Sequence, residues 1–196
     1  MARKGPVTTD TTSIALGLAQ IRIGASATYI GYLGQVLDSD DSIGSLANTK
    51  LMGNTDFFKL EGGFPLIEEF TTPIREAASL ECAFREISPY NLALAYGLDP
   101  TSGYADVHSG ELALGAKVAP AYIRMEALYT YPDGTNTMCI IFPRAQVSAA
   151  LEMDLQSEDA AAVPITFESK NASSDVSGGN AVWDDMPLGR IEWKEA

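Results

Sequence analysis

Histidine and cysteine are scarce in this sequence of 196 residues, which contains one histidine and two cysteines. It has no cysteine pair at zinc spacing, no P-loop, no His-Glu-x-x-His and no Gly-x-Gly-x-x-Gly motif after a strand. The single histidine, His108, lies in a loop of glycine, serine and aspartate with no cysteine nearby to activate. We therefore expect a surface histidine, no catalytic residue, no metal site and no cofactor.

The two cysteines, Cys82 and Cys139, each lie within an apolar run typical of a strand. Such positions favour buried thiols and folding in a reducing compartment. A disulfide between the two stays open as an alternative, because spacing along the chain does not constrain the geometry of a bridge.

Long apolar runs are also missing from the sequence. No stretch approaches the roughly 20 apolar residues that a membrane helix needs. Residues 1–12 contain Arg3 and Lys4 but not the continuous apolar segment of a secretory signal. We expect no membrane partner and no export by that route.

Positive charge is in short supply, with 13 basic against 26 acidic residues and a formal net charge of −13. This balance disfavours sequence-independent binding to the phosphate backbone of nucleic acids. Almost all of the acidity lies beyond Leu37. The simplest interpretation of the charge is an acidic surface that keeps the protein in solution.

Alternation of apolar and polar residues is the dominant pattern. It predicts strands at 14–23, 29–34, 74–86, 111–117, 123–131, 138–142, 147–155, 164–167 and 188–193. The clearest element is a hairpin of 123–131 with 138–142, joined by the turn Pro132-Asp133-Gly134-Thr135. The sequence lacks the alternation of strands and long helices that would indicate a parallel sheet. The predicted class is mainly β, an antiparallel β-sandwich or partly closed barrel.

One short helix is expected beside this sheet. Ser88 is a typical N-cap, Pro89 suits the first helical position, and Gly97 can adopt the left-handed terminal conformation. Because so short a helix is marginal alone, we expect it to pack its Leu92 side against the sheet.

Two segments lose clean alternation. Residues 171–182 are rich in serine and glycine and predict a flexible loop. Residues 36–73 predict a long loop excursion that is too apolar for a disordered linker. We expect its large apolar residues to bury against another subunit: Leu46, Leu51, Met52, Phe57, Phe58 and Phe64.

Acidic residues are the only abundant chemical groups. The pairs Glu68–Glu69 and Glu152–Asp154 each bring two carboxylates together in the sequence, as a glycosidase dyad needs, but nothing else in the sequence indicates a glycosidase. Residues 38–41 lack the glycine and glutamate that would complete a calcium loop. Three tyrosines at strand spacing suit packing better than ligand stacking: Tyr122, Tyr129 and Tyr131. A carbohydrate- or ligand-binding β-sandwich stays open as an alternative.

Three segments together resemble the tail tube proteins of long-tailed bacteriophages. They are residues 80–98, the hairpin around Pro132-Asp133-Gly134, and residues 140–145 leading to 163–168, in the matching order. This resemblance covers roughly the central half of the chain. It implies a β-sandwich with a flanking helix whose hexameric rings stack into a tube that conducts genomic DNA.

The resemblance also implies partners and a location. The partners would be further copies of the chain and other tail proteins, in a virion tail assembled in the host cytoplasm, with DNA passing through unbound. From strand alternation we expect some of four acids to line a negatively charged lumen: Glu81, Glu126, Glu152 and Asp154. An inner-tube subunit of a contractile injection or secretion machine is the alternative within the same structural class.

Overall fold

The computed structural model describes residues 17, 19–64, 67–98, 111–112, 114–115, 120–132, 134–148, 151–153, 155 and 161–194. Seven strands lie in this part of the chain: β1 (Gln20–Ala25), β2 (Leu46–Gly62), β3 (Ile67–Phe84), β4 (Ile123–Thr130), β5 (Thr137–Val147), β6 (Val163–Ser169) and β7 (Arg190–Lys194). The helical elements are α1 (Ser26–Tyr29), α2 (Pro89–Ala95) and the short 3₁₀ helices η1 (Ser39–Asp41) and η2 (Ala181–Trp183).

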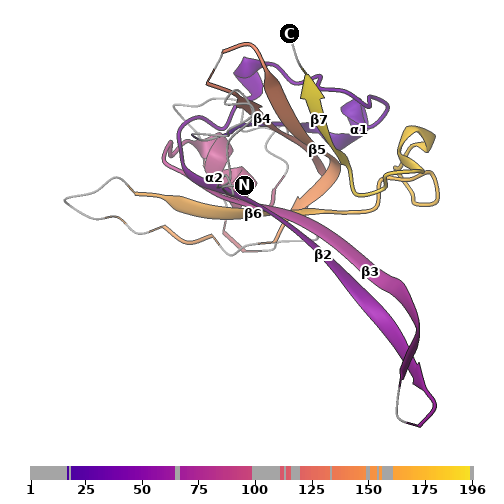
Figure 1. The fold of residues 1–196 in the computed structure, drawn as a ribbon. Helices are drawn as coiled ribbons and strands as arrows, with labels where there is room; N and C mark the ends of the chain where they lie inside the picture. The colour runs from indigo at the N-terminus through magenta and orange to yellow at the C-terminus, as the bar shows by residue number, and fades with distance from the viewer. Residues whose placement is uncertain are drawn as a thin grey trace, which may run out of the picture.

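All seven strands belong to one antiparallel sheet with the order β1-β4-β5-β6-β3-β2, and β7 adds to β5. One edge of β5 pairs with β4, while its other edge pairs with β7 over 137–141 and with β6 over 145–147. β5 therefore links two layers, and β6 with the bases of β2 and β3 runs below β4, β5 and β7 in Figure 1. The predicted mainly β, antiparallel class is confirmed; the sheet stays open, with β1 and β2 at its ends.

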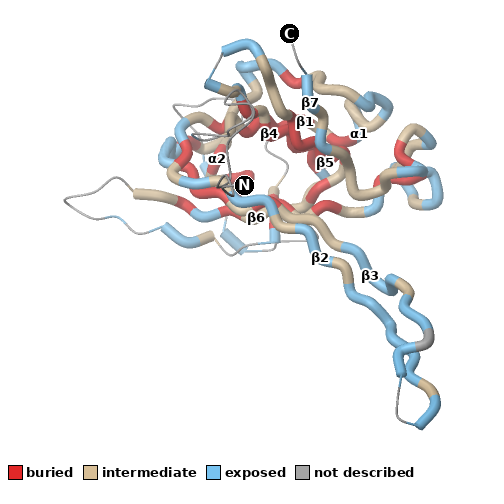
Figure 2. Tube along the Cα trace, viewed as in Figure 1, coloured by how far each residue is buried: buried red, intermediate tan, exposed pale blue. Residues whose placement is uncertain are grey.

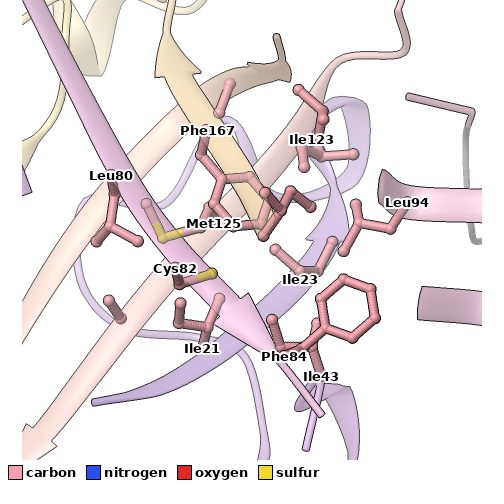
Figure 3. Close-up of a cluster of buried hydrophobic side chains, with 14 of the residues drawn as sticks. Ile21, Ile23, Ile43, Leu80, Cys82, Phe84, Leu94, Ile123, Met125 and Phe167 are labelled. Atoms are coloured by element: carbon pink, nitrogen blue, oxygen red, sulfur yellow. The ribbon is translucent and has the colours of Figure 1, made fainter. Parts of the chain in front are cut away.

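The main core fills the space between the two layers (Figure 3). Leu80, Cys82 and Phe84 project from one face of β3, as the alternation predicted, and are at most 3% exposed. Side chains from the opposite layer complete the cluster, including Ile21, Ile23, Ile123 and Met125. Each large apolar side chain buried in this way contributes roughly 1.5–3 kcal/mol.

Helix α2 confirms the predicted cap but corrects the predicted packing face. The Ser88 hydroxyl accepts a hydrogen bond from the Asn91 amide, and Gly97 has φ of 78°. The Asn91 side chain is buried and donates to the backbone oxygens of Ile43 and Glu86. This anchor turns the following residues inward, so Leu94 rather than Leu92 enters the core.

A second, smaller core covers the outer face of β4 and β5. It consists of Cys139, Ile141, Ala172 and Trp183, with Ile30, Leu128, Val182 and Met186 packed against it. The predicted strand at 29–34 is wrong: this stretch begins at the end of α1 and continues as turns. Here the chain covers a sheet face instead of pairing at an edge, so its apolar residues follow no strand period.

The serine- and glycine-rich segment at 171–182 is a series of tight turns rather than the predicted flexible loop. Its backbone is fixed by hydrogen bonds such as Ala172 N to Pro187 O and Asn180 N to Ala172 O. Trp183, which follows it, is fully buried and donates its indole N–H to the backbone oxygen of Ile30. Composition alone did not reveal this anchor, because the tryptophan lies one residue beyond the biased stretch.

Other predicted elements have mixed outcomes. The hairpin of β4 and β5 is confirmed, as are strands at β3, β6 and β7. The predicted strand at 147–155 is wrong, because β5 ends at Val147 and residues 151–153 are not in a strand. The described residues of 111–117 are also outside any strand. Cys82 and Cys139 are buried free thiols in different cores.

The predicted loop excursion at 36–73 is the main correction. Residues 46–62 and 67–84 form strands of 17 and 18 residues, paired as one hairpin that projects far beyond the body (Figure 1). β6 pairs with β3 only from Ser79 onward, so the two strands continue alone beyond that point. We call residues 53–78 the arm. Both of its faces meet solvent (Figure 2), so the period-two signal of a half-buried strand is absent.

Candidate assembly surface

The arm is a two-stranded ribbon with large apolar side chains in water. The part of β2 that lies in the arm, residues 53–62, extends roughly 33 Å at about 3.3 Å per residue. Phe58 and Leu60 share one face, and the cross-strand partner of Leu60 is Phe70. These three side chains are 49%, 47% and 54% exposed. We call them the arm's apolar face.

Five of the six residues predicted to bury against another subunit are accessible in the single chain. Leu51, Phe57, Phe58 and Phe64 are exposed, and Met52 is half-buried. Leu46 is the exception, because it is 8% exposed and belongs to the chain's own core. The prediction missed further exposed apolar residues on the second strand: Ile67, Phe70 and Ile74. Their signal was present, since 67–74 contains three large apolar residues within a charged stretch.

Backbone edges along the arm are free among the described strands, because β2 pairs only with β3. Unpaired edges of this kind are templates for pairing with another chain. Two register shifts, at Asp56/Phe57 and Leu60/Glu61, interrupt the ladder. Such irregularities limit uncontrolled pairing.

Charged residues on the arm are paired near its tip. Lys59 contacts the Glu68 carboxylate at 2.9 Å, and Thr71 also donates a hydrogen bond to that group. The Thr71 hydrogen bond and then the Lys59 hydrogen bond hold the pKa of Glu68 below its usual range. Glu68 therefore stays charged, and the tip combines exposed apolar groups with fixed polar ones.

Glu126 was predicted to line a lumen, and that prediction is wrong. Its carboxylate is fully buried and lies 2.8 Å from the Arg124 guanidinium, which is also fully buried. It accepts hydrogen bonds from the backbone amides of Val36 and Leu37. The outer face of β4 is covered by residues 29–37, which alternation along β4 alone could not indicate.

The remaining candidate acids are dispersed. Glu81 lies on the outer face of β3, 3.7 Å from Lys50, with a 45% exposed side chain. Glu152 is exposed in the stretch after β5, and Asp154 lies outside the described residues. Glu168, which sequence reasoning missed, pairs with Lys170 at 2.6 Å on the strand next to Glu81. The hydrogen bond from Lys170, then one from Ser148, lowers the pKa of Glu168.

Side chains of the metal-binding types are dispersed over the described part of the chain. No group of three or more His, Cys, Asp and Glu side chains there is placed to hold a metal ion. The acidic run at 38–41 instead closes a capping box between Asp38 and Asp41. His108 lies outside the described residues. None of the described helices is both long and apolar enough to cross a membrane.

The tyrosines and cysteines have packing roles. Tyr129 is buried and meets Tyr131 edge to face, with ring centroids 5.1 Å apart. The Arg144 guanidinium covers the Tyr122 ring at 3.8 Å. Burial raises the pKa of both thiols, Cys82 and Cys139, to about 12, so neither is a thiolate at neutral pH.

No protein-family model and no curated protein sequence matches the chain. A cryo-EM structure of the anti-feeding prophage cap, described as the AFP tube terminating cap, matches with a TM-score of 0.39 and 14% sequence identity. The match covers 100% of this chain and 95% of that chain.

Proposed function

We propose that this chain is a self-assembling structural subunit, and specifically the subunit of a bacteriophage tail tube. Six copies form a ring, rings stack, and the tube conducts genomic DNA from a virion whose tail is assembled in the host cytoplasm. The partners of the chain are its own copies and other tail proteins.

The arm is the observation that supports this proposal. A ribbon of this length, with Phe58, Leu60 and Phe70 in water, costs hydration free energy unless another surface covers it. Its own body cannot do so, because the continuous strands carry these side chains away from it. A second copy supplies the missing surface, and a repeated contact of this kind builds an extended assembly.

Charge supports a conduit rather than a DNA-binding protein. A ring of six chains carries 6 × 13 = 78 net negative charges. Duplex DNA carries one negative charge per roughly 1.7 Å, so the ring repels it. A polymer that is repelled slides without binding.

Negative-stain microscopy of the concentrated protein tests the proposal. We expect rings with sixfold symmetry and tubes made from them. A protein that stays monomeric at every concentration would contradict the tail tube proposal.

The lumen is assigned to the outer face of β3 and β6, where Glu81 and Glu168 lie on adjacent strands. Changing both to lysine adds 2 × 6 = 12 lysines to each ring and creates phosphate contacts. We expect DNA release from particles with such tubes to slow at low salt and to recover at high salt.

The matched control is the pair Asp175→Lys and Asp185→Lys, two exposed acids in the turns around η2. These substitutions change net charge equally but lie near the cover of the second core, away from the assigned lumen. Release that is unchanged at both salt concentrations in the Glu81/Glu168 variant would reject this face as the lumen. Tubes that form but never carry DNA would favour an injection-machine subunit.

A further inference from the structure

An apolar groove of about 220 Å³ lies where the arm leaves the body. Its walls come from the base of the hairpin, from β5, and from the entry to β7: Leu51, Gly53, Ala78, Ile140, Arg190 and Ile191. The volume is below the roughly 300–1,000 Å³ of pockets for small molecules. It suits a few large side chains presented by a protein surface.

The groove is open at Gly53. A Cβ atom added at this residue would have no heavy atom within 4 Å. Leu51 and Ile191 at the walls are 40% and 39% exposed, and Trp193 further along β7 is 62% exposed. The groove is thus continuous with an exposed apolar strip on β7.

We propose that this groove binds the apolar face of the arm from a second copy of the chain. The proposal rests on the proposed assembly function and names the receptor for the arm. Phe58, Leu60 and Phe70 are the side chains that enter or cover the groove.

A chain cannot fill its own groove with its own arm. Leu51 and Leu60 lie on one unbroken strand, and nine residues at about 3.3 Å each place them roughly 30 Å apart. The contact therefore joins two different patches on two copies. Such head-to-tail contacts continue from copy to copy, closing into rings or extending into a filament.

Charge complementarity favours this partner over an unrelated apolar segment. On β7, Arg190 and Lys194 share one carboxylate, that of Glu192, at 3.1 and 3.9 Å. The Arg190 Nε atom is buried without a hydrogen-bond partner among the described residues. Residues 56–73 of the arm contain four acids, Asp56, Glu61, Glu68 and Glu69, against Lys59 alone. Because Arg190 lines the groove, the groove presents one basic residue to an acidic ribbon.

Site-directed crosslinking between two mixed variants tests the contact. Gly53→Cys marks the groove, and Thr72→Cys marks the arm's apolar face, because Thr72 is the cross-strand partner of Phe58. The native thiols do not compete, since both are 3% exposed and burial raises their pKa to about 12. We expect a short bis-maleimide to yield a linked dimer at least tenfold more efficiently than in a mixture of Asn54→Cys with Thr72→Cys.

Asn54 is a matched control because it is exposed and adjacent to Gly53, on the opposite face of the hairpin. Tubes that form with equal crosslinking from positions 53 and 54 would overturn the groove contact and leave the tail tube proposal standing. A linked dimer without any ring or tube would support the contact and contradict the tube. If neither tubes nor linked dimers form, both the groove contact and the tail tube proposal are contradicted.

A groove-filling variant gives an independent measurement on the same site. The new side chain in Gly53→Phe occupies open space. The urea unfolding midpoint of the unassembled variant should therefore equal that of the unassembled parent. We expect this variant to form at least tenfold less tube mass, whereas Asn54→Phe assembles as the parent does. Equal assembly by both phenylalanine variants would overturn the proposal.

Discussion

Replacing Arg124 with methionine is expected to lower the free energy of unfolding by about 3–5 kcal/mol. The fully buried guanidinium donates to the Glu126 carboxylate at 2.8 Å and to the backbone oxygens of Tyr29, Tyr32 and Gly34 at 2.7–2.9 Å. Methionine leaves all four acceptors without this donor, and each buried unsatisfied group costs about 1–3 kcal/mol. The whole free energy of unfolding of a typical domain is only about 5–15 kcal/mol.

Urea unfolding of the dispersed protein measures this loss, with Arg144→Met as the control. Arg144 is half-buried, covers the Tyr122 ring and makes one exposed hydrogen bond to Asn171 O. We expect the control to lose about 1 kcal/mol or less, since exposed charged contacts contribute little. Equal losses for Arg124→Met and Arg144→Met would contradict the role given to Arg124 in holding residues 29–37 on the sheet.

Removal of the arm is expected to abolish tubes while leaving a folded protein. The cut follows the register: Asn54 pairs with Ala77, so residues 55–76 are replaced by Asn-Gly, which forms a tight hairpin turn. The core residues Leu80, Cys82 and Phe84 remain in place on β3. Assembly should fall at least a hundredfold, because the exposed side chains that we propose as the contact between copies are gone.

Light scattering and microscopy measure assembly of the shortened chain, and its urea midpoint reports the fold. The control replaces only the tip, residues 63–66, with Asn-Gly, which keeps the apolar face of Phe58, Leu60 and Phe70. We expect this control to assemble. Tubes from the 55–76 replacement that match the parent in length and number would show that the arm is not the assembly element.

The sequence predicted the elements whose own residues show a clear local pattern. Alternation located β3 and the hairpin of β4 and β5, and Ser88 with Pro89 located the start of α2. Local side-chain chemistry determines these features, so a single sequence was sufficient to predict them.

The arm could not be predicted as a hairpin, because both of its faces are exposed and no period-two pattern results. The predicted bounds, 36–73, also mixed it with Ile43 and Leu46, which belong to the core. Similarly, Glu126 appears as a polar residue in an alternating strand. Its burial depends on Arg124 and on residues 29–37, a contact between segments about 90 residues apart in sequence, of the kind that alternation along one strand does not encode.

A cryo-EM reconstruction of particles formed by the full-length protein tests the central claim most directly. We predict stacked sixfold rings in which each arm crosses to a neighbouring copy, with Phe58, Leu60 and Phe70 covered by that copy. Particles whose arms point freely into solvent, or a protein that stays as single chains at the highest attainable concentration, would contradict it.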